Sequence, residues 1–253
     1  MIMTIINAIA FVVMILVNIL ANTGRLGGYT TGEISSQYNN ILTPAGWTFS
    51  IWGVIYALLL VFVVASFFNS SARDITNRLG NWFWISCVFN ILWLLTWHSN
   101  LIWLSMIMMI GLLGTLIGMN IKLIGTYNLF SAGFSTYLGW ITVAFLANFT
   151  VMLVSFGMNG LGTNSQIWTT AILPVAALVI AAVVFFKADW VYGLTAMVAY
   201  LGIVYRQVAP TGLGAKYAGP LTASLVSLII ISFVTIFLIL NGRMLNKFAF
   251  FKN

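Results

Sequence analysis

Two side-chain amides stand inside long apolar stretches of this sequence, and each shares a predicted helical face with aromatic rings. Asn90 is followed at i+3 by Trp93 and at i+7 by Trp97, a spacing that places the three on one side of a helix. A second stripe with helical spacing is made up of Tyr137, Trp140, Ala144 and Asn148. An unpaired amide is costly in hydrocarbon, so we expect both amides to face protein or a ligand.

A third stripe lies in the segment LTPAGWTFSIWGVIY, which ends at Tyr56. Trp52 and Tyr56 are related as i and i+4 and share one helical face, with Phe49 about one turn earlier. Flat rings with a few amide or phenol groups suit a cavity for a planar amphipathic ligand. Packing of helix against helix is the alternative, and tryptophans near helix ends are typical of the interfacial belt of a membrane protein.

Other chemistries find little support in the sequence. The three acidic residues, Glu33, Asp74 and Asp189, fall in predicted loops or at helix ends, which leaves no carboxylate at mid-membrane depth for a proton relay or an ion-coupling site. His98 is the single histidine and Cys87 the single cysteine, so neither a metal site nor an intrachain disulfide is expected. No catalytic triad spacing, phosphate loop or dinucleotide fingerprint occurs. We therefore predict that the protein is not an enzyme.

The elements that must position these residues are transmembrane helices. The chain is 62% hydrophobic and 5% charged, which is typical of an integral membrane protein. A span needs about 20 apolar residues, and eight candidates are found: 2–21, 47–68, 82–98, 101–123, 136–156, 167–187, 190–206 and 221–241. We predict an all-α protein with about eight transmembrane helices, the first of them a retained helix and not a cleaved signal.

The distribution of basic residues predicts an orientation. When alternate loops are assigned to opposite sides, one side receives Arg73, Arg78, Lys122, Lys187, Arg243, Lys247 and Lys252. The other side receives only Arg25, Arg206 and Lys216. This asymmetry predicts a multi-pass protein of the plasma membrane with both termini in the cytoplasm. Lipid headgroups account for the net charge of +7, so no nucleic-acid partner is expected.

Two further features are a long connection and a set of glycines within one predicted span. The segment 22–46 is long and polar, and it is either a lid or a solvated connector. Gly114 and Gly118, preceded by Gly111, permit close approach of another helix. In a chain with this many helices, we interpret that contact as internal and not as a dimer seam. No internal repeat is found, so the inverted-repeat signature of many transporters is not visible.

Three motifs together resemble one family. Pro44, Trp47, Trp52 and Tyr56, then the N-x-x-W of Asn90 and Trp93, then the Y-x-x-W-x-x-x-A-x-x-x-N that ends at Asn148, resemble the tryptophan-rich sensory protein family, TspO/MBR, which includes the translocator protein. Their order matches the second, third and fifth helices of that five-helix bundle. The resemblance covers about residues 1–156, and residues 157–253 would add three transmembrane helices and a basic cytoplasmic tail.

The resemblance implies a ligand site. Members of that family bind porphyrins, haem, sterols and synthetic aromatic ligands, in a pocket covered by the loop after the first helix. By resemblance, segment 22–46 is the lid, and the ligand-binding residues are Trp52, Tyr56, Asn90, Trp93, Tyr137, Trp140, Ala144 and Asn148. A porphyrin or haem would be a ligand and not a covalently attached cofactor, and no metal ligands are predicted.

The sequence also departs from the family pattern. Pro44 stands alone where members usually carry a double proline, Trp47 to Trp52 is one residue shorter than usual, and the sterol motif expected after the fifth helix is absent. The added helices would cover the surface that relatives use to dimerise, which predicts a monomer but leaves a dimer open. We expect a membrane sensor or carrier for a planar hydrophobic or amphipathic ligand. The alternative is a multi-helix permease for a small amphipathic molecule.

Overall fold

The computed structural model describes residues 1–241, and the predicted basic positions Arg243, Lys247 and Lys252 lie outside the described residues. The long helices are α1 (Ile2–Asn22), α3 (Ile51–Phe68), α5 (Trp82–His98), α6 (Ile102–Lys122), α7 (Leu129–Ser155), α8 (Thr163–Lys187), α9 (Trp190–Val208) and α10 (Ala218–Leu240). Three short helices are α2 (Thr31–Gln37), the 3₁₀ helix η1 (Gly46–Ser50) and α4 (Ser70–Leu79). Across the described chain there is no strand, which confirms the all-α prediction.

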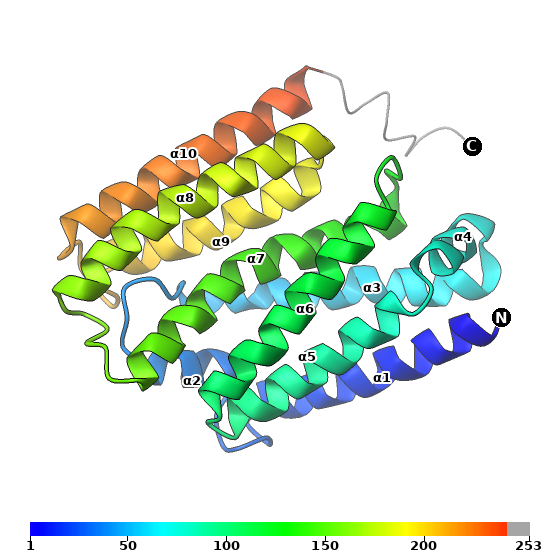
Figure 1. The fold of residues 1–253 in the computed structure, drawn as a ribbon, viewed down its shortest axis with the longest axis horizontal. Helices are drawn as coiled ribbons and strands as arrows, with labels where there is room; N and C mark the ends of the chain where they lie inside the picture. The colour runs from blue at the N-terminus through cyan, green and yellow to red at the C-terminus, as the bar shows by residue number, and fades with distance from the viewer. Residues whose placement is uncertain (242–253) are drawn as a thin grey trace.

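The long helices form two groups (Figure 1). Helices α1, α3, α5, α6 and α7 form a five-helix bundle, and α8, α9 and α10 pack together as a three-helix group. Helix α9 joins the groups by packing against α7, where a Cβ added at Gly139 would lie 2.8 Å from the Tyr192 carbonyl oxygen. The Ser135 hydroxyl also donates a 2.6 Å hydrogen bond to Asp189, which caps α9. The three-helix group is therefore attached along α7.

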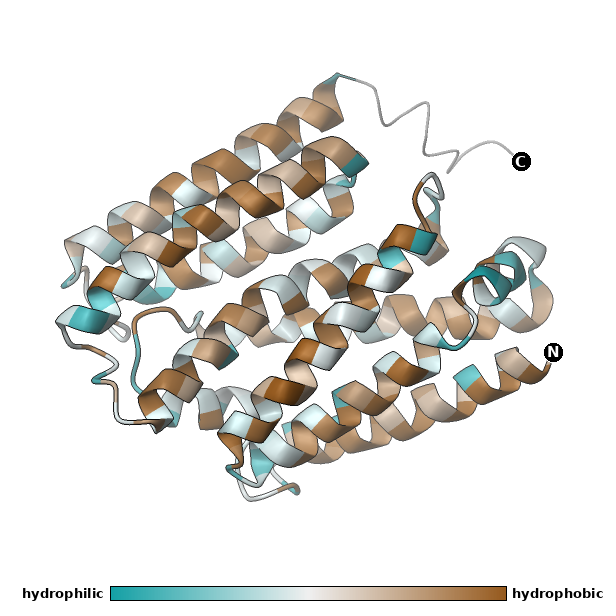
Figure 2. Ribbon diagram, in the orientation of Figure 1, coloured by the Kyte–Doolittle hydropathy of each residue, from teal (hydrophilic) through white to brown (hydrophobic). Residues whose placement is uncertain are grey.

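Six helices within residues 1–241 are long and apolar enough to cross a membrane. A seventh span arises if α4 and α5, which meet at a 71° bend, are taken together. Two of the long helices are not among these six. Helix α5 alone has 17 residues. Helix α9 lies among α7, α8 and α10 and buries polar residues such as Thr195 and Gln207. The predicted multi-pass membrane architecture is confirmed, and its count of eight is approximate. Hydrophobic residues cover the long helices, while hydrophilic ones gather on α4 and at helix ends (Figure 2).

Two local predictions need correction. Helix α7 begins at Leu129 and not at Thr136, because the Asn128 side chain accepts a 2.9 Å hydrogen bond from the Ser131 amide and starts the helix earlier. The segment after α3, expected to be a loop, contains the amphipathic helix α4, which is capped by Asn69 and followed by Gly80 at φ 56°. Buried Ile75 and Leu79 fix α4 against the bundle.

Two of the three glycines singled out in α6, Gly111 and Gly118, make the internal contact that the sequence predicts, and Gly114 does not. An added Cβ would lie 2.3 Å from the Phe89 ring at Gly111 and 2.5 Å from the Trp82 ring at Gly118. Both rings belong to α5, so these glycines let α5 and α6 approach closely. Gly114 faces open space.

Candidate functional site

The five-helix bundle brings the predicted aromatic residues into one cluster centred on Trp52. Its ring centroid lies 5.4 Å from that of Tyr56, with the planes nearly parallel at 19°. The centroids of Trp93, Tyr137 and Trp140 lie 5.7, 5.8 and 6.1 Å from it. We refer to these five residues as the ring cluster. Because three helices contribute, the three stripes read from the sequence converge at one place.

Asn90 is held by a hydrogen-bond chain that crosses the bundle. It accepts from the Asn18 amide at 2.8 Å and donates to the Tyr137 hydroxyl at 2.7 Å. The Tyr56 hydroxyl in turn donates to the Asn18 side-chain oxygen. This chain, Tyr56–Asn18–Asn90–Tyr137, connects α3, α1, α5 and α7. Asn90 thus faces protein, one of the two outcomes expected for it.

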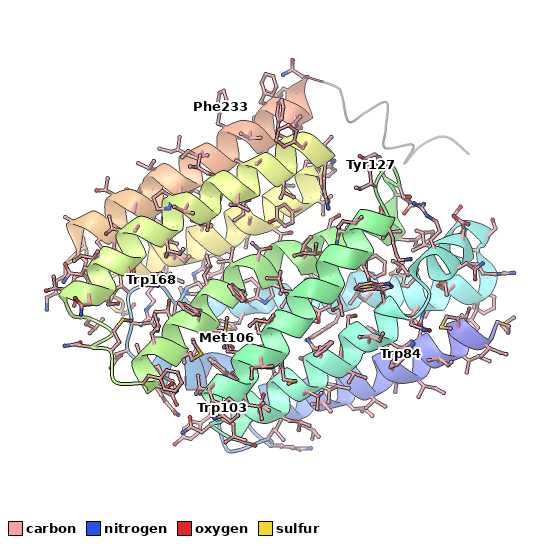
Figure 3. The ribbon with its side chains drawn as sticks, in the orientation of Figure 1. Trp84, Trp103, Met106, Tyr127, Trp168 and Phe233 are labelled. Atoms are coloured by element: carbon pink, nitrogen blue, oxygen red, sulfur yellow. The ribbon has the colours of Figure 1, made fainter. Side chains whose placement is uncertain are left out.

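Asn148 also faces protein. Its side-chain oxygen accepts a 3.0 Å hydrogen bond from the Trp93 indole. Its amide nitrogen lies 3.4 Å from the Ser105 hydroxyl and 3.4 Å from the sulfur of Met106, which is labelled on α6 in Figure 3. Asn148 therefore fixes the orientation of Trp93.

The larger of two cavities at the cluster lies between α1, α2, η1 and α3. This lid-side cavity has a volume of about 580 Å³. Aromatic and polar side chains share its wall, among them Asn18, Asn22, Glu33, Phe49, Trp52 and Tyr56. Of the predicted ligand-binding residues, only Trp52 and Tyr56 reach it.

The second cavity lies between the lid and the bundle, where Thr31, Ser35 and Pro44 form part of its wall. It has a volume of about 30 Å³, which is room for about one water molecule. Its wall includes Trp93, Trp140, Ala144 and Asn148, together with Trp52. The Trp140 indole nitrogen is buried without a hydrogen-bond partner. The rings themselves fill the space in which the sequence analysis places a ligand. The structure shows that the predicted ligand-binding residues lie close together, and their contact with a ligand stays a prediction.

Segment 22–46 folds over the cluster as an ordered cover, which we call the lid. The Thr31 hydroxyl lies 3.2 Å from Nε2 of His98, and the Trp97 indole donates to the Thr31 carbonyl at 3.3 Å. The Tyr38 hydroxyl donates to the Asn100 side chain. These contacts with α5 and the turn after it favour the lid interpretation over a solvated connector.

The last part of the lid, residues 39–46, is called the return segment, and it is held by the three-helix group. The Ala45 amide donates a 3.0 Å hydrogen bond to the Gly202 carbonyl of α9. A Cβ at Gly202 would lie 2.0 Å from the Thr48 hydroxyl of η1, directly after the return segment, and one at Gly160, in the loop between α7 and α8, would lie 1.8 Å from the Asn39 carbonyl oxygen. Both glycines are therefore required for this close approach.

Acidification is expected to loosen the lid. The Thr30 amide donates a 2.7 Å hydrogen bond to the Glu33 carboxylate, and this bond holds the pKa of Glu33 below its usual 4.5. The resulting stabilisation of α2 is fully present above pH 4.5 and is lost as the pH falls through the folded-state pKa. A nitroxide at exposed Gln37 (Gln37→Cys) should therefore become more mobile below pH 4.5.

The control for this measurement is Glu33→Gln, which keeps a capping side chain but cannot titrate. Its nitroxide mobility should not change over the same pH range. Cys87 is buried and should not take up the label. Equal pH dependence in both proteins would contradict the role given to Glu33.

The main residue missed by sequence reasoning is Asn18. It stands in the first apolar span, as Asn7 does, and it links Tyr56 to Asn90. An amide inside an apolar span was the signal that identified Asn90 and Asn148, and the same signal applied to α1 finds Asn18. The attachment of the return segment to α9 could not be found in this way, because no polar residue in an apolar span marks it in the sequence.

The comparisons with known proteins agree with this architecture. The family model described as TSPO-like protein matches residues 4–241. The match runs through the five-helix bundle and also through α8, α9 and α10, and so extends beyond the 1–156 region that carries the motifs. No curated protein and no solved structure matches the chain.

Proposed function

Because this chain belongs to the TSPO-like protein family, we propose that it is a membrane-embedded binding or sensor protein for a planar hydrophobic or amphipathic ligand, of the tetrapyrrole or lipid kind. The observation that carries the proposal is the lid-side cavity of about 580 Å³ beside the stacked Trp52 and Tyr56 rings. Its volume falls within the range of about 300–1,000 Å³ found for small-molecule sites.

The lining of the lid-side cavity suits such a ligand. Phe49 and Trp52 offer ring surface to an apolar plane, and Asn22 and Glu33 offer polar groups near the lid. A mostly apolar wall with a few polar groups fixes both affinity and orientation. An amphipathic plane would lie with its apolar part on the rings and its polar edge toward the lid.

The predicted residues take two roles in this proposal. Trp52 and Tyr56 contact the ligand, while Asn90 and Tyr137 hold Tyr56 in place through Asn18. The remaining four, Trp93, Trp140, Ala144 and Asn148, line the small second cavity and not the lid-side cavity, so they would touch a ligand only if the rings of the cluster moved apart.

Gly53 offers a direct test, because it lines the lid-side cavity and a Cβ there meets nothing within 4 Å. Gly53→Leu should fill the cavity without disturbing the bundle, since leucine favours a helix more than glycine does. We expect affinity for protoporphyrin IX, followed by saturable quenching of tryptophan fluorescence, to fall by at least about tenfold. Thermal stability should be unchanged or higher.

The matched control is Gly114→Leu, which makes the same change on α6 at another exposed glycine with open space around it. It should bind like the wild type. Equal binding by Gly53→Leu would remove the cavity assignment, and equal non-saturable quenching in all three proteins would indicate partitioning into the apolar surface.

A sensor, a carrier and a permease differ in whether they move the ligand across the membrane. Vesicles that contain the protein should show saturable binding without net movement of the probe if the protein is a sensor, and time-dependent transfer if it is a carrier or permease. The probe should be recovered chemically unchanged, because we propose a binding protein and not an enzyme. Chemical cross-linking in native membranes tests the predicted monomer.

We also propose a plasma-membrane location with both termini in the cytoplasm. Helix α1 begins and α10 ends at the same end of the molecule (Figure 1), which supports termini on one side. The asymmetry of basic residues supports the cytoplasmic side.

A further inference from the structure

A third cavity, distinct from the two at the ring cluster, lies between the lid and the three-helix group. Its volume is about 530 Å³. The return segment, the end of α9 and the loop after α9 form its wall, with Asn39, Trp47, Tyr205, Arg206, Thr211 and Gly212 among the residues that line it. We call it the Arg206 cavity. It adjoins the lid-side cavity, because Ser36 and Gly46 line both.

Among residues 1–241, Arg206 is the only charged residue that lines this cavity, and none of the acidic side chains there neutralises it. The chain has three acidic residues: Glu33 caps α2, Asp74 lies in α4, and Asp189 caps the opposite end of α9. The one hydrogen bond found for its guanidinium is a long one, 3.4 Å to the Thr43 carbonyl. Several N–H donors of the guanidinium therefore have no partner in the described chain.

Capping of α9 does not account for Arg206. The loop after α9 turns back and satisfies the last carbonyls of the helix itself. Ala209 donates to Tyr205 at 2.9 Å, Leu213 to Arg206 at 2.9 Å, and Ala215 to Gln207 at 2.7 Å. Gly212 permits this turn, since an added Cβ would lie 2.1 Å from the Arg206 carbonyl oxygen. The Arg206 guanidinium is therefore not needed to cap α9 and can bind another group.

The surroundings of Arg206 indicate what that partner is. Trp47 and Tyr205 are each about half exposed, and their rings meet edge to face at 6.1 Å. Exposed Trp and Tyr at helix ends are typical of the headgroup level of a bilayer. At that level the abundant anion is phosphate, and the planar fork of arginine matches phosphate oxygens in a bidentate manner.

We propose that the Arg206 cavity binds a phosphate group, supplied either by a lipid headgroup or by free phosphate. Arg206 is the binding residue, and Trp47 and Tyr205 flank it. Since Arg206 also contacts the Thr43 carbonyl, the occupied site would sit directly against the return segment. This inference does not depend on the ligand of the ring cluster.

The test compares Arg206→Gln with Lys216→Gln, which removes the same charge from an exposed position in the loop after α9. Free phosphate is measured by equilibrium dialysis of radiolabelled inorganic phosphate against protein in a non-ionic detergent. The lipid arm uses native mass spectrometry with phosphatidylglycerol, and with a diacylglycerol of the same acyl chains that lacks the phosphate. Arg206→Gln should weaken phosphate or phosphatidylglycerol binding by at least about tenfold, while Lys216→Gln should bind like the wild type.

Saturable binding of inorganic phosphate that depends on Arg206 would show that free phosphate suffices, and binding of phosphatidylglycerol alone would identify a lipid headgroup. Either supports the site. Equal binding in Arg206→Gln or an equal loss in Lys216→Gln would overturn it, and so would a wild-type protein that binds no inorganic phosphate saturably and also does not prefer phosphatidylglycerol to diacylglycerol. If Arg206→Gln does not fold, Arg206→Lys replaces it, and binding between that of wild type and background is expected because the charge remains while the fork is lost.

Discussion

Asn90→Ala is expected to lower the free energy of unfolding by about 2–3 kcal/mol, because it removes two hydrogen bonds inside the bundle and leaves the buried Tyr137 hydroxyl without its donor. The Tyr137 hydroxyl loses its 2.7 Å bond, and the Asn18 amide loses its 2.8 Å acceptor but keeps its 2.9 Å bond to the Met14 carbonyl. Asn90 is fully buried, so water cannot replace the lost bonds without a cavity forming. Reversible unfolding in mixed micelles of increasing dodecyl sulfate content, followed by circular dichroism, measures the change.

Asn241→Ala is the control for that experiment. Asn241 caps the end of α10 and is exposed, and within residues 1–241 its side-chain amide donates to the Phe237 carbonyl one turn back. We expect a change of less than about 0.5 kcal/mol for this variant. Similar losses in the two variants would mean that the chain Tyr56–Asn18–Asn90–Tyr137 contributes no special stability.

Gly202→Leu is expected to detach the return segment from α9. A Cβ at this position would lie 2.0 Å from the Thr48 hydroxyl, so α9 and η1 must separate. The 3.0 Å hydrogen bond from the Ala45 amide to the Gly202 carbonyl is then lost. Amide hydrogen exchange in the return segment should accelerate by at least about tenfold. Exchange in α5 should not change.

The same substitution at Gly114, where there is open space, should leave exchange in the return segment at the wild-type rate. An unchanged exchange rate in Gly202→Leu would show that α9 does not restrain the lid. The protein would then hold the lid through α5 alone.

The helices and the three separate aromatic stripes could be predicted from the sequence because both depend on local periodicity, whereas a common pocket for the stripes was implied by the family resemblance. Asn90, Trp93, Tyr137 and Trp140 repeat at the helical period, and an apolar span makes every polar group within it conspicuous. The family match over residues 4–241 confirms the resemblance drawn from these motifs.

Pairing across the bundle could not be predicted in the same way. The partner of Asn90 is Asn18, which lies 72 positions away in sequence, and no local pattern connects the two. The division of the predicted pocket into a wide and a nearly filled cavity depends on how ring planes tilt, and Trp52 meets Trp140 at 79°. The attachment of Ala45 to Gly202 depends on how the two groups of helices pack. Each of these features belongs to tertiary packing and not to sequence spacing.

The lid is fastened at both of its flanks, to α5 by Thr31 and to α9 by Ala45. The lid-side cavity nevertheless lies beside lipid, since Ile19 of α1 and Gly53 of α3 line it and are exposed. A ligand that arrives sideways between these two helices comes from the hydrocarbon, where its concentration is set by partitioning. Occupancy would then follow the mole fraction of the ligand in the bilayer, and an apparent Kd expressed in aqueous units would rise with the amount of lipid in the assay.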